Sequence, residues 1–168
     1  MGMYQNIRDI LDVVWNDEDL NRLLYYKPED ESTNVLDPLS PTLPNILDID
    51  EDWKIRNDTI MITPKDDDLT NKVKCRLFVY LGNRRPLGGS RSFQTVNQEL
   101  IIDVLCHADF ENGDMRSNRI GDRLNELFSL NNITGLGKMD YGGGRIISRV
   151  PSQYAGYQHT YEFGGTKR

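Results

Sequence analysis

The chain has 168 residues, 38% of them hydrophobic, which suits one domain that buries a core of its own. Its net charge of -6 lacks the basic surplus of a protein that reads double-stranded nucleic acid, so any contact with DNA would have to be local. No apolar run approaches the roughly 20 residues that cross a bilayer, and the N-terminus lacks a signal-peptide pattern, so we expect a cytoplasmic product without a membrane partner.

Apolar residues at helical spacing open the chain and stop at Asn16, which is a good N-cap for a second helix. Pro28 ends this second helix because a proline cannot supply an interior N–H. The sequence thus predicts an N-terminal helical pair. Its apolar stripes are Tyr4, Ile7, Leu11, Val14 and Trp15 in the first helix, and Leu20, Leu23 and Leu24 in the second.

Residues 28–58 interleave prolines with runs of acidic residues. Proline at this density argues against a helix and against a central strand, so the sequence predicts an extended segment. Several of its side chains are too apolar for a free linker, and we expect them to contact an adjacent chain: Leu39, Leu43, Ile46 and Trp53. A disordered stretch is the alternative.

Strands are expected next. Residues 59–63 are a short β-rich run, and residues 73–81 alternate with the period of a strand that has one buried face. Residues 93–107 contain a nearly continuous apolar run, typical of a central strand. The two longer runs predict a β-hairpin whose tip spans residues 82–92, about twice the usual two to five residues.

This hairpin tip combines arginines with glycines, and its candidate functional residues are Arg84, Arg85, Gly88, Gly89 and Arg91. One interpretation is a phosphate-contacting tip, because glycine lets backbone N–H groups approach a phosphate and arginine pairs with it in bidentate fashion. The others are an ordinary exposed turn and a tip that docks into a neighbouring subunit. The sequence leaves all three open.

The clearest helix is predicted after Asp114, with one apolar face made of Ile120, Leu124, Leu127 and Phe128. Shorter strands at 135–141 and 145–150 and a long aromatic strand at 154–163 follow. We expect the helix to pack on a sheet that contains Leu100, Ile102 and Val104. The order of elements predicts a single α+β domain over 1–168: one mostly antiparallel sheet, with the N-terminal helical pair and one long amphipathic helix packed on it.

The sequence contains little that is typical of a catalytic site. Neither a Gly-x-Ser-x-Gly elbow nor a Walker loop occurs in the sequence. His107 lies near Asp103 and Asp109, but we interpret this as a strand end that emerges into solvent. The acidic runs 48–52 and 66–68 do not match an EF-hand loop, and we expect solvated loop charge.

The sequence also gives little indication of a metal site or of redox chemistry. Cys75 and Cys106 lie in apolar strand-like runs, which predicts two buried thiols, and His107 and His159 are not at ligand spacing from them. We expect no catalytic residue, no metal and no cofactor, hence no enzyme. The rival hypothesis is a small nucleic-acid-processing enzyme that binds Mg²⁺ through carboxylates such as Asp58, Asp66, Glu99 and Asp103.

Three stretches together resemble a known family. They are the helical ending Leu23-Leu24-Tyr25-Tyr26, the helix start Asp114-Met115-Arg116-Ser117-Asn118-Arg119-Ile120, and the strand Tyr154-Ala155-Gly156-Tyr157-Gln158-His159-Thr160-Tyr161. In layout they are similar to the tail terminator and tail completion proteins of tailed bacteriophages, which sit at the neck between head and tail. The similarity spans nearly the whole chain, and residues 28–58 fit it least well.

The resemblance implies a structural subunit of the virion that is assembled in the host cytoplasm. Such subunits form a six-fold homo-oligomeric ring that ends the tail tube, with the tail tube protein and a head-side connector protein as partners. DNA passes through such rings, so arginines of the tip facing the lumen would make sequence-independent phosphate contacts. Another neck subunit, such as a head-closure or connector protein, is the alternative within the same class.

Overall fold

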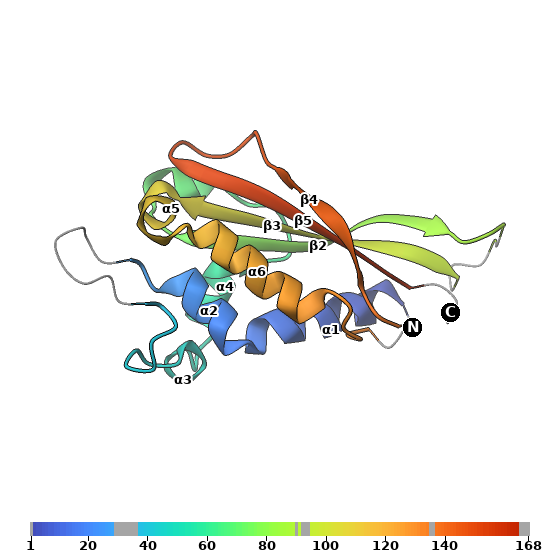
Figure 1. Cartoon of the computed structure of the whole chain (residues 1–168), viewed down its shortest axis with the longest axis horizontal. Helices are drawn as coiled ribbons and strands as arrows, with labels where there is room; N and C mark the ends of the chain where they lie inside the picture. Colours follow the sequence, from blue (N-terminus) through green and yellow to red (C-terminus); the bar gives the residue numbers. More distant parts are fainter. Residues whose placement is uncertain (1, 29–36, 90, 92–94, 135–136, 165–168) are drawn as a thin grey trace.

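The computed structural model describes residues 2–28, 37–89, 91, 95–134 and 137–164, which build one five-stranded sheet with helices against it (Figure 1). The strand order is β1-β2-β3-β5-β4. The strands are β1 (Ile60–Met61), β2 (Cys75–Pro86), β3 (Val96–His107), β4 (Asp140–Ile146) and β5 (Tyr154–Gly164). Only β1 pairs in parallel, with β2, so the predicted α+β fold with a mostly antiparallel sheet is confirmed.

The N-terminal helical pair is α1 (Met3–Asn16) and α2 (Glu18–Tyr25). The N-cap of α2 is Asp17, one residue later than predicted, because its carboxylate accepts a hydrogen bond from the backbone N–H of Leu20 at 2.9 Å. Arg123 donates to the same carboxylate at 2.6 Å, so this cap also ties α2 to a later helix. Within the described residues, no helix has the length and apolarity to cross a bilayer.

The later helix, α6 (Arg116–Phe128), begins after Met115, whose backbone φ is 53°. The sequence predicted that Asp114 caps this helix, and this prediction is wrong because Met115 occupies the N-cap position. The apolar face of α6 packs on the inner face of the sheet, as expected. The core joins Ile120, Leu124 and Phe128 of α6 to Cys75, Leu77, Val79, Leu100, Ile102, Val104, Cys106, Tyr161 and Phe163 of the sheet, with Leu127 partly buried beside them.

A short helix that the sequence did not indicate, α5 (Ala108–Asp114), follows β3 directly. His107 begins it, because its Nδ1 accepts a hydrogen bond from the backbone N–H of Asp109 at 3.1 Å. The ring of His107 is buried and lies edge-on to Tyr154, with centroids 5.1 Å apart. The expectation that His107 emerges into solvent is therefore wrong.

Residues 37–58 are not the extended segment that the sequence predicted. They contain α3 (Ile46–Ile49) and most of α4 (Lys54–Thr59). Asn45 caps α3 by accepting from the N–H of Leu47, and the segment lies beside α2 (Figure 1), where Arg22 donates to the carbonyl oxygen of Ser40 at 3.0 Å. Residues 29–36 of the predicted segment lie outside the described residues.

The hairpin between β2 and β3 also differs from its prediction. Residues 82–86 were expected in a loop because of Gly82 and Pro86, yet β2 continues through Pro86. A register shift between Leu81 and Arg84 absorbs one residue, and Arg84 to Pro86 then pair with Gln98 to Val96. The tip is thus shorter than 82–92, and Ser92 lies outside the described residues.

The outer face of the sheet, opposite α1, α2 and α6, is covered only at the end near α5. There Leu69 of the 3₁₀ turn η1 (Asp67–Asn71) joins Phe78, Leu105 and Tyr154 in a second, smaller core. Toward the hairpin the side chains of this face are half-buried or exposed. This open end of the outer face is where the candidate site lies.

Candidate assembly surface

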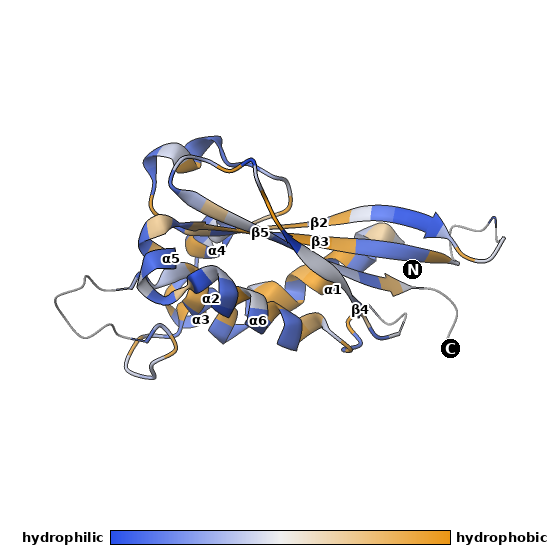
Figure 2. Cartoon of the chain, turned by 45° about the horizontal axis from the view of Figure 1, so that its top comes forward, coloured by the Kyte–Doolittle hydropathy of each residue, from blue (hydrophilic) through white to orange (hydrophobic). Residues whose placement is uncertain are grey.

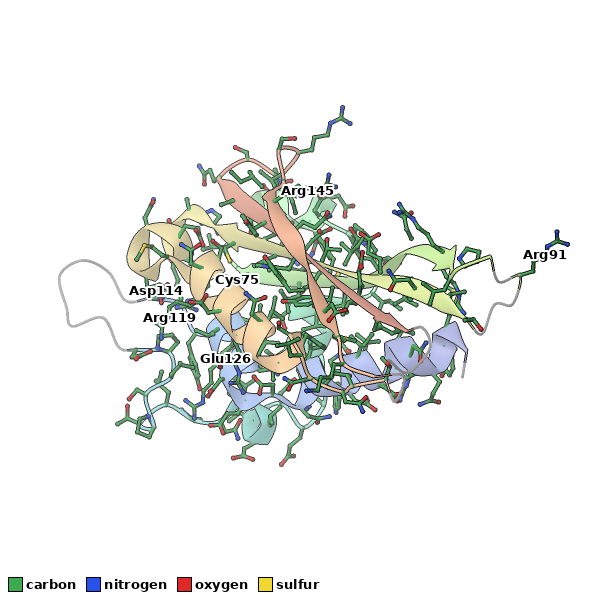
Figure 3. The ribbon with its side chains drawn as sticks, turned by 45° about the vertical axis from the view of Figure 1, so that its right-hand side comes forward. Cys75, Arg91, Asp114, Arg119, Glu126 and Arg145 are labelled. Carbon is green, nitrogen blue, oxygen red and sulfur yellow. The ribbon has the colours of Figure 1, made fainter. Side chains whose placement is uncertain are left out.

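The hairpin of β2 and β3 projects beyond the rest of the sheet as an arm, whose described residues are 82–89, 91 and 95–98 (Figure 1). The end of β2 within it is hydrophilic (Figure 2). Arg85 and Arg91 are exposed, and Arg91 points away from the body at the end of the arm (Figure 3). Gly88 and Gly89 have φ of 48° and 77°, a backbone conformation that glycine adopts without strain.

The base of the arm is held by one buried amide. The side-chain nitrogen of Gln98 donates to the carbonyl oxygens of Gly82 and Asn83, each at 3.2 Å, so it binds the strand where the register shifts. Its side-chain oxygen accepts from Arg84 at 3.3 Å. The arm therefore leaves the body in a fixed direction, although its far end has little to pack on.

Beside the base of the arm, the outer face is a shallow trough of about 520 Å³. Strand pairing arranges its side chains in rows, because residues opposite each other on adjacent strands share a face. The row next to the arm is Glu99, Glu162 and Asp140, on β3, β5 and β4. The second row is Ile101, Thr160 and Gly143, and the third is Asp103, Gln158 and Arg145.

The third row is internally satisfied. Arg145 donates to Gln158 at 2.9 Å, and Gln158 donates to Asp103 at 2.8 Å (Arg145 is labelled in Figure 3). The hydroxyl of Tyr80 donates to the same carboxylate at 2.7 Å. Burial raises the pKa of Tyr80, and the hydrogen bond to Asp103 raises it further, so the phenol keeps its proton. The carboxylate of Asp103 thus accepts hydrogen bonds from Tyr80 and Gln158 of its own chain.

The acidic loops are not simply solvated, as the sequence suggested. Arg76 is fully buried and donates to Asp68 at 2.7 Å and to Asp58 at 3.1 Å. The hydrogen bond from Arg76 holds the pKa of Asp68 well below its usual range. In the other acidic run, Asp50 is buried and accepts from Nε of Arg56 at 2.9 Å. Removal of one of these carboxylates would leave a buried arginine without its partner, which destabilises a fold.

The carboxylates of the rival enzyme hypothesis lie in separate surroundings. Asp58 is bound by Arg76 and Lys74, beside η1. Asp66 lies exposed before η1, while Glu99 and Asp103 are two rows apart on β3. Across the described part of the chain, no group of three His, Cys, Asp or Glu side chains is arranged to hold a metal ion. The structure therefore does not bring the four residues of that hypothesis together.

The four residues expected to contact an adjacent chain differ in how far their own chain buries them. Ile46 is fully buried within its own chain, so that prediction is wrong for Ile46. Trp53 is half-buried; it lies edge-on to Trp15 at 5.4 Å, with the guanidinium of Arg56 stacked 3.6 Å from its ring centroid. Leu43 is half-buried and Leu39 is exposed, and for both a contact with another chain remains a prediction.

Sequence reasoning found the arm but missed the acidic row next to it. Glu99 and Glu162 are 63 positions apart in the printed sequence, and nothing in either strand shows that they face each other. The available signal was the outward position of Glu99 in its alternating strand and of Glu162 in the aromatic strand. Only the register of the strands turns these two observations into one surface.

The fold and this surface define an α+β protein with an arm and an open sheet face. The YomW family model matches residues 17–163, and the chain belongs to this phage-derived family. It is 38% identical over 172 aligned positions to the SPbeta prophage-derived uncharacterized protein YomW of Bacillus subtilis (strain 168). The alignment covers 97% of each chain, so the two proteins match along nearly their whole lengths.

Proposed function

We propose that this chain is a structural subunit of a phage neck, which forms a ring that ends the tail tube and joins it to the head-side connector. Membership of a phage-derived family supports a role in the particle. The resemblance in layout to tail terminator and tail completion proteins supports the position at the neck. The observation that carries the proposal is the arm.

The arm is suited to binding another protein chain. An isolated two-stranded hairpin is marginally stable in water, and one that projects from its domain gains little from burial. The outer strand edge of β2 in the arm has no neighbouring strand among the described residues. A contact between this arm and a different surface of a second copy is heterologous, and such contacts form a ring when the rotation between successive copies closes.

The partners follow from this position. The ring would contact the tail tube protein on one side and the head-side connector protein on the other, within the virion. Arg84, Arg85 and Arg91 on the arm would make sequence-independent contacts with DNA in the lumen where they are not used between subunits. The proposed role needs no catalysis, metal or cofactor.

The test is the oligomeric mass of the purified full chain, measured by native mass spectrometry alone and with tail-tube protein. In the arm-shortened variant, Asn-Gly replaces residues 84–97 between Asn83 and Gln98. We expect the full chain to form a closed ring and the arm-shortened variant to remain a folded monomer. A shortened chain that still forms rings and supports normal particle yield would refute the proposal.

The same purified chain distinguishes the proposed function from two alternative functions. A head-closure or connector subunit would also form a ring, but it would bind the head-side partner and not the tail-tube protein. The enzyme hypothesis predicts that the purified chain cuts or nicks plasmid DNA with Mg²⁺, and that Asp58→Asn abolishes this activity. If the plasmid stays intact, the enzyme hypothesis is rejected.

A further inference from the structure

The acidic row at the base of the arm is an unusual arrangement for a sheet. Glu99 lies directly opposite Glu162, and Glu162 lies directly opposite Asp140, so three carboxylates stand side by side across β3, β5 and β4. Like charges directly opposite each other on adjacent strands destabilise a sheet. The row therefore reduces the stability of the isolated subunit.

Arg145 lines the same trough, but its guanidinium donates to Gln158, and no ion pair within the described residues joins it to these carboxylates. Glu162 accepts a hydrogen bond from the side-chain nitrogen of Asn97 at 3.1 Å, and Glu99 accepts one from the backbone N–H of Asn83 at 3.3 Å. Neither these two carboxylates nor Asp140 forms an ion pair there, whereas Asp17, Asp50, Asp58, Asp68 and Asp114 all pair with arginine. The row thus differs from these five paired carboxylates, because its three members face one another across the strands without an ion pair in the described residues.

The surface around the row is open to a chain of another molecule. Gly142, Gly143 and Gly144 line the trough on β4. A Cβ added at Gly143 would meet no heavy atom within 4 Å, so an incoming backbone can approach the sheet at this residue. Half-buried Ile101 lies in the next row and gives the trough an apolar floor. β4 is also the edge of the sheet, and no strand among the described residues pairs with its outer side.

The arm carries the complementary charge. Arg85 and Arg91 are exposed, and neither forms an ion pair in the part of the chain that the structure describes. Arg91 points away from the body of its own molecule (Figure 3). We propose that the acidic trough lined by Glu99, Glu162 and the glycines of β4, with Asp140 continuing the acidic row beside it, is the receptor for the arginine arm of a second copy of this chain.

This inference rests on the proposed function and adds the surface that the arm binds. Arm and trough are different parts of one chain, so each subunit gives an arm to one neighbour and receives an arm from the other, which is the head-to-tail arrangement of a ring. A second copy is favoured over DNA because three carboxylates repel phosphate. Opposite charges across the contact also select the correct partner and orientation.

The test reverses the charges on each side separately. One variant carries Glu99→Lys and Glu162→Lys, the other Arg85→Glu and Arg91→Glu, and association is measured by sedimentation velocity. We expect each reversal alone to weaken association between copies about tenfold or more, because it places like charges together. Mixing the two variants, or combining all four substitutions in one chain, should restore association, since the charges are again opposite.

Matched controls show whether the charge itself is responsible. Glu99→Gln with Glu162→Gln keeps the size of the side chains and removes the repulsion, so the monomer should unfold at the same temperature as the unmodified chain or higher. Lys167→Gln with Arg168→Gln tests whether the basic C-terminal residues are the occupant instead. Loss of association in that variant, with Arg85→Glu and Arg91→Glu unaffected, would overturn the assignment of the arm.

The outcomes also separate this inference from the proposed function. If the arm-shortened variant loses the ring but reversal of the acidic row changes nothing, the arm binds elsewhere and only the receptor is wrong. If Ca²⁺ binds the unmodified chain by calorimetry and the Gln variant loses that binding, with association unchanged, the row is a cation site instead. A full chain that stays monomeric refutes both.

Discussion

Gly121 gives the sharpest test of how α6 lies on the sheet. It is a buried residue inside the helix, and a Cβ added there would lie 2.8 Å from Nε2 and 3.0 Å from Cε1 of His159 on β5. Real Cβ atoms essentially never approach other heavy atoms so closely. His159 is itself buried beside Tyr157, with ring centroids 5.0 Å apart, so its ring is confined on that side, while a pocket of about 150 Å³ borders it on the side of Gly121.

Two effects oppose each other in Gly121→Ala. Alanine in a helix interior is favoured over glycine by about 1 kcal/mol, whereas overpacking a core typically destabilises by about 1–3 kcal/mol. The clash is with a confined ring, so we expect overpacking to prevail and the free energy of unfolding to fall by about 1 kcal/mol. In a His159→Ala background the obstacle is gone, and the same substitution should then stabilise by about 1 kcal/mol.

Urea unfolding of the four proteins of this cycle, at about pH 8 where histidine is neutral, measures both changes. The expected signature is a reversal of sign, which a general loss of helix stability cannot produce. A Gly121→Ala protein that is more stable than the unmodified chain would refute the close packing of α6 on β5.

Three further outcomes test the fold. Leu124→Ala removes a fully buried side chain between α6 and the sheet and should reduce the free energy of unfolding by about 2–5 kcal/mol; an unmoved melting temperature would reject this placement. Burial lowers the pKa of His159, so below about pH 6.5 the unfolded chain binds a proton that the folded chain does not; stability should fall from about pH 7 to 5, and His159→Gln should flatten this slope. The amides of Ile55 and Arg56 donate to the buried carboxylate of Asp50, so hydrogen exchange should show them protected in the isolated chain and unprotected in Asp50→Ala; rapid exchange in the unmodified chain would contradict this.

The parts of the fold that the sequence predicted are those set by local periodicity. The apolar face of α6 and the alternating strand before the arm follow from the spacing of side chains, and both lie where expected. The errors came from treating proline and glycine as breakers. Pro86 is accommodated at the sheet edge, and Gly82 fits beside Ile101, where a Cβ would lie only 2.7 Å from its Cδ1.

Contacts between distant residues were beyond the sequence. The segment after Pro44 was predicted to be extended because prolines interleave with acidic runs in residues 28–58. Instead, Asp50 turns inward to bind Arg56, and it accepts hydrogen bonds from the backbone N–H groups of Ile55 and Arg56 in the first turn of α4. The candidate site shows the same limit. The arm was visible as a glycine-rich and arginine-rich stretch, whereas the acidic row exists only because the register places Glu99 opposite Glu162.

The central claim is that the chain functions by assembling with copies of itself through the arm. Native mass spectrometry of the purified full chain, side by side with the arm-shortened variant, tests it most directly. A single discrete ring for the full chain, six copies by the resemblance to tail terminators, and a folded monomer for the variant is the predicted result. A full chain that remains monomeric even with tail-tube protein present, or a shortened chain that assembles equally well, would contradict the account.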